Sequence, residues 1–275
     1  MKKLIIIGHK NPDVDSVISG ILLSSKIKNS EYIIPDKYLD LDTYNLLLKY
    51  RIDMKKYQKE IPKNSNLFLV DHSETYIQGS VIGIIDHHNT ILKKTPKYYI
   101  NRDISSTALI IYKEFENKFT KEELELIVLA NLVDTASFHS SKTKKEDIAV
   151  TLKIVEENNL DYKKLYNDGL CLTPLSNLRN AAFNGYMKLK INNKVIASSY
   201  VQLQKLDYDD LRIMTDILKK ELYIDNIDLY VFIIHDMNNL KTKTIYIENN
   251  KITEYNFNKY TSRKETINKY LNLTK

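Results

Sequence analysis

The sequence has little cysteine and no long apolar run. A single cysteine, Cys171, stands among 275 residues, which excludes an internal disulfide and a metal cluster held by cysteines. No apolar stretch approaches the roughly 18 residues of a membrane span, and the chain begins with the strand-like MKKLIII instead of a secretory leader. These absences predict a cytoplasmic protein without a membrane partner, in which Cys171 is a small buried residue.

A strong charge bias, internal repeats and low-complexity segments are also missing. The 41 Lys and Arg residues exceed the 35 Asp and Glu residues by only six. The lysines are scattered and do not form the basic stripe that is typical of nucleic-acid binders. We therefore predict no nucleic-acid partner. The small excess of positive charge is compatible with a small polyanionic substrate. The 43 % share of hydrophobic residues is enough for one large core or two smaller ones.

The stretch GHKNPDVDS, residues 8–16, is the densest group of candidate metal ligands. It lies between two apolar runs, which predicts a strand, a loop and a helix. His9, Asp13 and Asp15 offer one imidazole and two carboxylates, a mixture that suits a divalent ion such as Mn²⁺. The alternative is structural, because Asp15 or Ser16 can also cap the following helix.

Two further apolar strands end in the same kinds of side chain. NLFLVD ends in Asp71, and VIGIIDHH ends in Asp86, His87 and His88. The carboxyl ends of parallel strands lie at one edge of a sheet, where ligands bind, and buried strands rarely carry unpaired charged groups. The pattern predicts one parallel sheet with a polar, metal-binding edge in the first half of the chain.

Helix signals in the first half add two observations. ISSTA, residues 104–108, opens a helix whose hydroxyl side chains can cap it and leave backbone N–H groups free for an anion. Thr120 and Glu123 form a capping-box pattern that opens a helix over 121–134. Asp134 ends this helix, where a carboxylate opposes the helix dipole, so we expect another role for it.

The chain becomes strand-rich after the small, polar segment PLSNLRNAAFNG. We predict an α/β fold with a metal-binding catalytic domain over 1–174, a linker over 175–185 and a substrate-binding domain over 186–275. Near the end, Arg263 and Lys264 are adjacent cations. They are either solvated surface residues or ligands for an anion.

Six motifs, GHKNPDVDS, FLVDHSE, GIIDHH, ISSTA, NLVDTASF and a late SRK, occur in this order. Together they resemble the family II, manganese-dependent inorganic pyrophosphatases of the DHH/DHHA2 phosphoesterase superfamily, over nearly the whole chain. The resemblance implies an N-terminal parallel-sheet DHH domain with flanking helices and a smaller C-terminal mixed-sheet domain of the DHHA2 type. It places the active site in the cleft between the two domains and implies a homodimer joined through the N-terminal domain.

The resemblance also implies an activity, the hydrolysis of inorganic pyrophosphate to two phosphates by a hydroxide that bridges two metal ions. The ions would be Mn²⁺ or Co²⁺, with Mg²⁺ accompanying the substrate. The residues implied to hold one ion are His9, Asp13, Asp71 and Asp134, and those implied to hold the other are Asp15, Asp71, His87 and Asp134. Asp71 and Asp134 would thus be shared.

The implied substrate contacts come from both halves of the chain. His88, Arg263 and Lys264 would contact phosphate during catalysis. Asp86 would orient a ligand histidine. The second domain would supply a further substrate lysine, for which Lys188 and Lys190 are the candidates.

The chain departs from the family pattern at four places. FHSSKT replaces Phe-Lys-Ser-Pro-Thr-Thr at 138–143, Val14 stands where the family usually has Thr, Ser105 replaces Gly, and Glu265 replaces a second Lys. We expect none of these departures to touch a metal ligand. We expect them to affect how the substrate is held and how long it can be.

Three other functions stay open. A short-chain exopolyphosphatase, acting on tripolyphosphate or longer chains, would share the metal site, although His9 and the NPD after it favour the pyrophosphatase. A nucleotide phosphodiesterase of the superfamily would carry a glycine-rich motif, whereas this chain has six glycines and no such cluster. A non-catalytic binding protein is the third, although every implied ligand position is filled.

Overall fold

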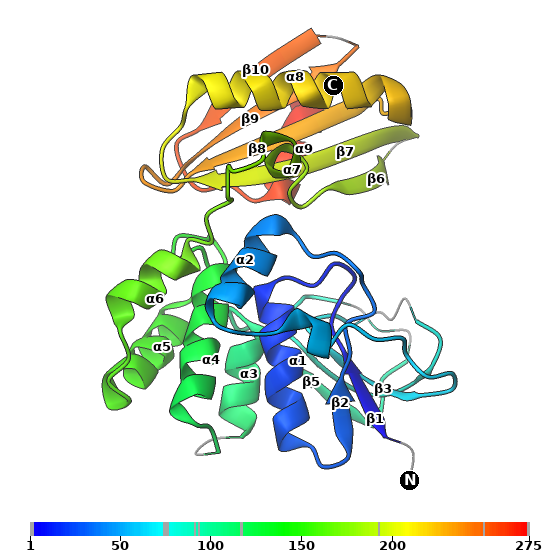
Figure 1. Cartoon of the computed structure of the whole chain (residues 1–275), viewed down its shortest axis with the longest axis vertical. Coiled ribbons are helices and arrows are strands. Elements are labelled where there is room, and N and C mark those ends of the chain that lie inside the picture. Colours follow the sequence, from blue (N-terminus) through cyan, green and yellow to red (C-terminus); the bar gives the residue numbers. More distant parts are fainter. Residues whose placement is uncertain are drawn as a thin grey trace. The chain divides into compact units, whose positions relative to one another are not determined.

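The computed structural model describes residues 3–73, 77–90, 92, 94–115, 118–191, 193–249 and 251–273. Glu74 of the FLVDHSE motif lies outside them. The chain forms two compact units (Figure 1). The first contains the residues up to Leu39, Leu46–Phe138 and Lys142–Leu170, and the second contains Asp40–Asn45, His139–Ser141 and the residues from Cys171 onward. The predicted linker at 175–185 stays a prediction.

The first unit contains a five-stranded, wholly parallel sheet in the order β2-β1-β3-β4-β5. Its strands are β1 (Leu4–Ile7), β2 (Ser30–Tyr32), β3 (Asn66–Val70), β4 (Ser80–Asp86) and β5 (Tyr98–Asn101). Ile7, Leu69 and Ile84 belong to a buried cluster on this sheet. Consecutive residues of β1, β3 and β4 are buried, so both faces of these strands are covered, and this explains why they read as continuous apolar runs. The predicted parallel sheet is confirmed, and β5 is a strand that the sequence pattern missed.

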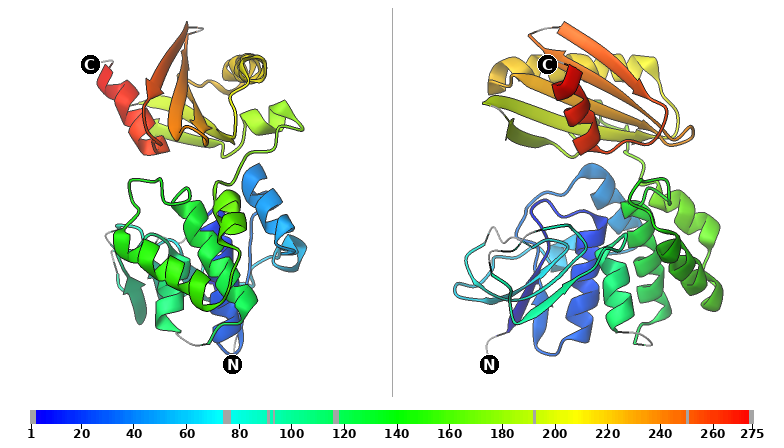
Figure 2. Two further views of the ribbon diagram at one scale, coloured as in Figure 1. Left: turned by 90° about the vertical axis from the view of Figure 1, so that its left-hand side faces the viewer. Right: turned by 180° about the vertical axis from the view of Figure 1, so that it is seen from behind.

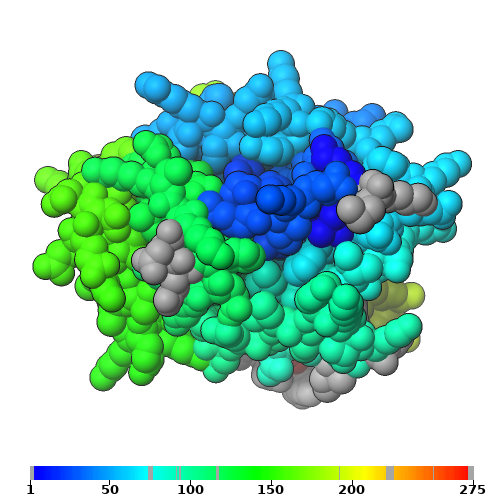
Figure 3. Space-filling view, turned by 90° about the horizontal axis from the view of Figure 1, so that it is seen from below, coloured from blue at the N-terminus to red at the C-terminus, as the bar shows by residue number. Residues whose placement is uncertain are grey.

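Helices α1, α3 and α4 of the first unit lie side by side (Figure 1). The helices that lie wholly in this unit are α1 (Val14–Lys26), the short 3-10 helix η1 (Met54–Lys56), α3 (Thr107–Glu114), α4 (Lys121–Asp134), α5 (Lys145–Glu157) and α6 (Tyr162–Gly169). Helix α2 (Leu41–Lys49) begins in the second unit and ends in the first. Figure 3 shows the blue N-terminal segment between cyan and green segments.

The predicted capping box is confirmed at the start of α4. The Thr120 hydroxyl accepts a hydrogen bond from the Glu123 N–H, and the Glu123 carboxylate accepts one from the Thr120 N–H. The two bonds satisfy backbone donors that the first turn of a helix leaves unpaired. The box fixes where α4 begins, and the helix runs from there to Asp134 at its other end.

The second unit contains a mixed five-stranded sheet in the order β10-β9-β8-β7-β6, in which only β7 and β8 are parallel. Its strands are β6 (Met187–Ile191), β7 (Lys194–Leu203), β8 (Leu229–Asp236), β9 (Lys241–Glu248) and β10 (Lys251–Phe257), and its helices are α7 (Leu178–Ala182), α8 (Tyr208–Asp225) and α9 (Arg263–Leu273). Alternate residues of β8 point to opposite faces. Phe232 packs in the cluster that includes α8, and Val231 in the one that includes α9 (Figure 2).

Two features bear on the predictions from composition. Cys171 is buried, as predicted. No helix in the described part of the chain has both the length and the apolar character that crossing a membrane requires.

Candidate metal centre

Polar side chains gather where three strands of the first sheet end. His9 lies two residues beyond β1, Asp71 directly follows β3, and His87 directly follows β4. These strands are adjacent and parallel, so their carboxyl ends share one edge. Asp71 has a left-handed backbone, with φ +64°, which is unfavourable for a residue with a side chain. An aspartate at such a strained position points to a functional need for its carboxylate.

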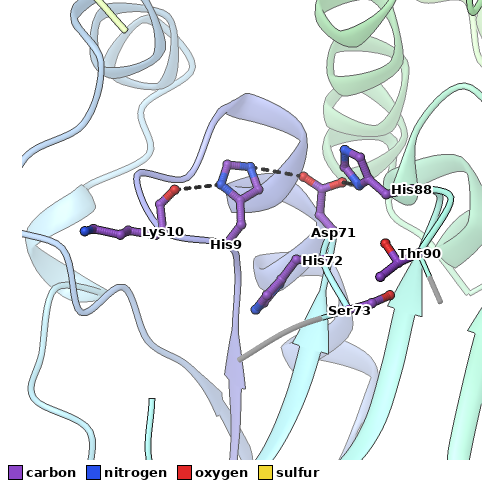
Figure 4. Close-up of a pocket in the computed structure, with 7 residues that line it drawn as sticks. All are labelled: His9, Lys10, Asp71, His72, Ser73, His88 and Thr90. Atoms are coloured by element: carbon purple, nitrogen blue, oxygen red, sulfur yellow. Dashed lines mark hydrogen bonds and ion pairs between the residues drawn. The ribbon is translucent and has the colours of Figure 1, made fainter. Parts of the chain in front are cut away.

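His9 faces two carboxylates. Its Nε2 lies 3.4 Å from Asp71 Oδ2 and 3.7 Å from Asp13 Oδ2. Its other ring nitrogen, Nδ1, lies 2.9 Å from the carbonyl oxygen of Lys10 (Figure 4). A proton on Nδ1 donates to this carbonyl and leaves the Nε2 lone pair for a cation, an arrangement that is usual for metal-binding histidines.

The two aspartates of the GHKNPDVDS motif each accept hydrogen bonds from backbone N–H groups at the start of a helix. Asp13 caps α1, since its Oδ1 accepts a hydrogen bond from Ser16 N at 3.0 Å, so the alternative that Asp15 or Ser16 is the cap is wrong. The Asp15 carboxylate accepts from Thr107 N at 2.7 Å and from Ala108 N at 3.0 Å. The N–H groups of α3 that we predicted to be free for an anion are therefore already bound to Asp15.

His87 lies between two further carboxylates. Its Nε2 is 3.3 Å from Asp71 Oδ1 and 3.6 Å from Asp134 Oδ2, while its Nδ1 is 3.1 Å from the Ile104 carbonyl oxygen. The two oxygens of Asp71 thus face two different histidines, His9 and His87. Asp134 Oδ2 is buried and has no hydrogen-bond partner among the described residues, which is the environment that a metal ligand needs.

Charge is concentrated in this cluster. Burial alone would lower the pKa of His87, but the Asp71 and Asp134 carboxylates outweigh it and raise the pKa to about 10. Burial, together with the charges of Asp71 and Asp134, raises the pKa of Asp15 well above its ordinary range. Without a cation the cluster retains protons, and a divalent ion would take their place.

The donor atoms form three groups, within each of which they lie within 4.8 Å of one another. The groups are His9, Asp13 and Asp71; Asp15, His87 and Asp134; and Asp71, His87 and His88. Each combines imidazole nitrogen with carboxylate oxygen, a donor set that suits divalent first-row ions. The structure thus brings together all six residues that the sequence suggested as metal ligands.

His88 is held by Asp86. Asp86 Oδ1 accepts from the His88 backbone N–H at 3.0 Å and lies 2.9 Å from His88 Nδ1, while Ser73 donates its hydroxyl proton to Asp86 Oδ2. Asp86 therefore orients His88, which belongs to one of the three donor groups, whereas the ligand histidines that the resemblance implied are His9 and His87. The residues lining the adjacent cavity of about 650 Å³ are His9, Lys10, Asp71, His72, Ser73, His88 and Thr90 (Figure 4).

The FHSSKT segment contacts one of the predicted metal ligands through Lys142, contrary to our expectation. The Lys142 Nζ donates to Asp134 Oδ1 at 2.7 Å. The chain returns to the cluster through three consecutive left-handed residues, Ala136, Ser137 and Phe138, with φ between 47° and 73°. No glycine marks this turn, so the sequence offers no signal for the contact.

Thr107 is a second residue beyond the predicted set that contacts the cluster. Its hydroxyl donates to Asp71 Oδ1 at 3.1 Å, and its side chain is fully buried. The hydroxyl cap predicted from ISSTA is confirmed, and it is Ser106, which accepts from Leu109 N. Thr107, the first residue of α3, instead positions the carboxylate of Asp71, which follows β3.

Two other departures from the family pattern make structural contacts. Ser105 donates both its backbone N–H and its hydroxyl to Asp147 Oδ2, at 2.7 and 2.6 Å. The Glu265 carboxylate accepts from Ser262 N at 2.9 Å, and Glu265 N donates back to the Ser262 hydroxyl at 3.4 Å. These bonds form a capping box at the start of α9. Glu265 therefore caps this helix, at a position where the family has a second lysine.

The remaining predicted residues lie in the second unit. Arg263 and Lys264 are the first two residues of α9. The guanidinium carbon of Arg263 lies 5.4 Å from the centroid of the Tyr200 ring, a contact that restricts the side chain. Lys188 and Lys190 both lie on the exposed strand β6.

Comparisons with known proteins agree with this architecture. Residues 3–136 match the family model described as DHH family, N-terminal domain. A manganese-dependent inorganic pyrophosphatase from Methanocaldococcus jannaschii is 28 % identical over 284 residues, covering 92 % of this chain and 89 % of that protein. One from Bacillus subtilis is 26 % identical over 265 residues, covering 86 % and 83 %. A crystal structure of a Methanococcus jannaschii protein has a TM-score of 0.71 at 19 % identity, with 95 % of each chain covered, which shows that the two chains share a fold.

Proposed function

This chain is a DHH family protein, and from that membership we propose that it hydrolyses inorganic pyrophosphate to two phosphates with the help of two bound Mn²⁺ ions. Relatives that align with 86–92 % of its length are named manganese-dependent inorganic pyrophosphatases. The imidazole and carboxylate donors at the edge of the first sheet suit Mn²⁺, with Co²⁺ as an alternative. Mg²⁺ would accompany the substrate.

The position of Asp71 carries the proposal. Its Oδ2 faces His9 and its Oδ1 faces His87, and a shared carboxylate is a common means of holding two divalent ions close together. We assign Asp71 to both ions. The further residues that we assign are His9 and Asp13 for one ion, and Asp15, His87 and Asp134 for the other.

The residues of this chain would orient the side chains that bind the ions. Bound divalent ions would supply an acidified water as nucleophile and would neutralise charge on the phosphate oxygens. The carbonyl groups of Lys10 and Ile104 fix the rings of His9 and His87 through Nδ1. Thr107 fixes the Asp71 carboxylate by its hydroxyl. These contacts hold the donor atoms in place before any ion arrives, which lowers the reorganisation that binding requires.

The substrate would be bound by cationic and imidazole groups. His88 lines the cavity beside the cluster, where it would contact a phosphate oxygen, and Asp86 holds its ring through Nδ1. From the second unit, Arg263 would offer a planar fork of donors and Lys264 a mobile point charge. Lys188 is our candidate for a further phosphate contact.

The test of substrate is phosphate release by the purified, Mn²⁺-loaded protein, comparing pyrophosphate with tripolyphosphate in the presence of Mg²⁺. We expect a strong preference for pyrophosphate in kcat/KM. A preference for tripolyphosphate would instead support a short-chain exopolyphosphatase with the same metal site. No release from either substrate, by protein shown to contain Mn²⁺, would contradict the proposed hydrolysis.

The test of the shared ligand is Asp71→Asn. Replacing one carboxylate oxygen by an amide removes a charged ligand between the two ions, so kcat should fall by roughly 10³-fold or more, since even groups that only support metal ligands are worth about 10–100-fold. Asp103→Asn is the matched control, because that side chain is 94 % exposed. Circular dichroism should show that both variants are folded. Near-normal turnover by Asp71→Asn would contradict the shared role.

A further inference from the structure

A partly buried cation at the start of α9, Arg263, has no acidic partner among the described residues. Arg102, by comparison, pairs with the carboxylate of Glu114. The guanidinium of Arg263 forms no ion pair and no hydrogen bond within the described part of the chain, although Arg263 is less exposed than the adjacent Lys264. A guanidinium that is partly removed from water usually has a carboxylate beside it, so this one is available to an anion from solution.

An aromatic ring and a glycine surround this guanidinium. Its carbon atom lies 5.4 Å from the centroid of the Tyr200 ring, which packs against the apolar cluster on the α9 face of the second sheet. Gly185 has φ +61°, and a β-carbon at this position would lie 2.1 Å from Tyr200 Cε1 and 2.8 Å from Arg263 Nη2. Any side chain at 185 would therefore displace the ring or the guanidinium. The Tyr200 N–H donates to the carbonyl oxygen of Asn184 at 3.0 Å, which holds the glycine turn beside β7.

The main chain at Arg263 is held on both sides. Before it, Thr261 N donates to the Thr242 hydroxyl at 2.9 Å, which ties the segment to β9. After it, the Thr266 hydroxyl donates to the Arg263 carbonyl oxygen at 2.7 Å. All three threonines are buried, and the capping box at the start of α9 adds two further hydrogen bonds. Because the backbone is fixed, the position of the guanidinium depends on what its side chain contacts.

We propose that Tyr200 is a positioning residue, which holds the Arg263 guanidinium ready for a phosphate group of the substrate. This inference rests on the proposed function. A flexible arginine loses rotamer freedom when it binds an anion, and a contact that restricts it beforehand reduces this cost. The face of a ring attracts a cation without accepting its hydrogen bonds in the way a carboxylate would. The N–H groups of the guanidinium therefore remain as donors to phosphate oxygens.

The first experiment measures KM and kcat for pyrophosphate with the Mn²⁺-loaded natural chain and two variants. Tyr200→Leu removes the ring, whereas Tyr200→Phe keeps the ring and removes only the hydroxyl group. We expect Tyr200→Leu to raise KM about tenfold with little change in kcat, which is the order of loss for one ring contact with a partly desolvated cation. Tyr200→Phe should restore most of the substrate affinity.

Tyr255→Leu is the matched control. Tyr255 is also partly buried and packs against the same apolar cluster, and the ammonium group of Lys269 from α9 lies 5.0 Å from the centroid of its ring. The control therefore removes the same kind of ring and the same kind of cation contact. Lys269 is not a proposed substrate residue, so KM in Tyr255→Leu should match that of the natural chain.

A second experiment observes Arg263 without relying on hydrolysis. The chain has five arginines, so an isotope-labelled, metal-free protein gives few side-chain Nε–H signals in nuclear magnetic resonance spectra. The Arg263 signal is identified by its loss in Arg263→Lys. A ring that faces a guanidinium displaces its proton signal upfield through the ring current. We expect this displacement in the natural chain and in Tyr200→Phe, and we expect it to vanish in Tyr200→Leu.

The outcomes separate this inference from the proposed function. An undisplaced Arg263 signal in the natural chain would overturn the inference. Equal rises of KM in Tyr200→Leu and Tyr255→Leu would also overturn it, as would a Tyr200→Phe variant as weak as Tyr200→Leu. None of these results bears on whether pyrophosphate is hydrolysed. A Mn²⁺-loaded natural chain that releases no phosphate would contradict the proposed function, while a displaced Arg263 signal would still support the contact with Tyr200.

Discussion

At the scale of single residues, His235 has a different environment from the five histidines in the first half of the chain. His235 is buried, its Nδ1 lies 3.1 Å from the Thr242 hydroxyl, and its ring stacks on Tyr260 with centroids 4.4 Å apart. Burial, with a smaller contribution from the Arg263 charge, lowers the pKa of His235 to about 3. In the folded protein this imidazole is therefore neutral above about pH 3.

The low pKa of His235 predicts a pH dependence of stability. The imidazole of an unfolded chain has a pKa of about 6.5. Between about pH 6.5 and pH 3 the unfolded state therefore binds a proton that the folded state does not, and stability falls as the pH falls. The slope approaches about 1.4 kcal/mol per pH unit for one proton.

Urea unfolding of the intact chain, measured at pH 7 and at pH 4.5, checks this prediction. The free energy of unfolding of the natural chain should drop more between the two pH values than that of His235→Asn, which cannot titrate. Each chain is compared with itself at the two pH values, so a loss of stability in the variant that does not depend on pH leaves the comparison unaffected. Equal slopes would mean that His235 is protonated in the folded state, contrary to the burial argument.

At the scale of elements, local signals decided which parts could be predicted. Helix α4 runs over Lys121–Asp134, the range predicted from its capping box, because Thr120 and Glu123 act within one turn. The parallel strands β1, β3 and β4 were equally visible, since strands covered on both faces are continuous apolar runs.

Elements that lack such signals were missed. Strand β5 has four residues, of which Tyr98 and Tyr99 are exposed, so neither an apolar run nor a clean alternation marks it. Helix α9 buries Ile267 and Tyr270, and Leu271 packs beside them, but the first turn of the helix is polar. Its amphipathic pattern is weak, and it reads as a surface tail. Both elements depend on tertiary contacts that no short window of sequence contains.

The candidate site shows the same limit. Motif spacing placed His9, Asp71 and His87 at strand ends, and parallel pairing then brings them together. The partner of the α3 N-terminus could not be found in this way, because Asp15 is 92 residues away along the chain. The contact of Lys142 depends on a left-handed turn that is built without glycine. The sequence therefore did not predict the long-range partners or the unusual backbone conformations.

At the scale of the whole molecule, the proposed chemistry is divided between two units with separate cores. The histidine and aspartate groups lie in the first unit, beside its own apolar cluster. The second unit has an apolar cluster on each face of its sheet and contributes Arg263 and Lys264. Because the cores are separate, a ligand that binds only one unit should stabilise that unit selectively.

Hydrogen exchange of the intact chain with and without Mn²⁺ checks this division. Ions bound to His9, Asp71 and Asp134 would connect the ends of β1, β3 and α4. An ion at a concentration of 100 times its dissociation constant stabilises the state that binds it by about 2.7 kcal/mol. Exchange should therefore slow in peptides from the first unit that contain these residues. Exchange in β7 and β8 of the second unit should stay unchanged, because those strands hold none of the proposed ligands.

The Asp71→Asn variant is the control for this experiment, since it should lose most of the Mn²⁺-dependent protection. Two results would contradict the argument. Equal slowing in both units would mean that the two cores open as one cooperative body, so that metal binding stabilises the whole chain. Unchanged exchange in the first unit, at Mn²⁺ concentrations that support phosphate release, would mean that the ions are held by residues other than those at the edge of its sheet.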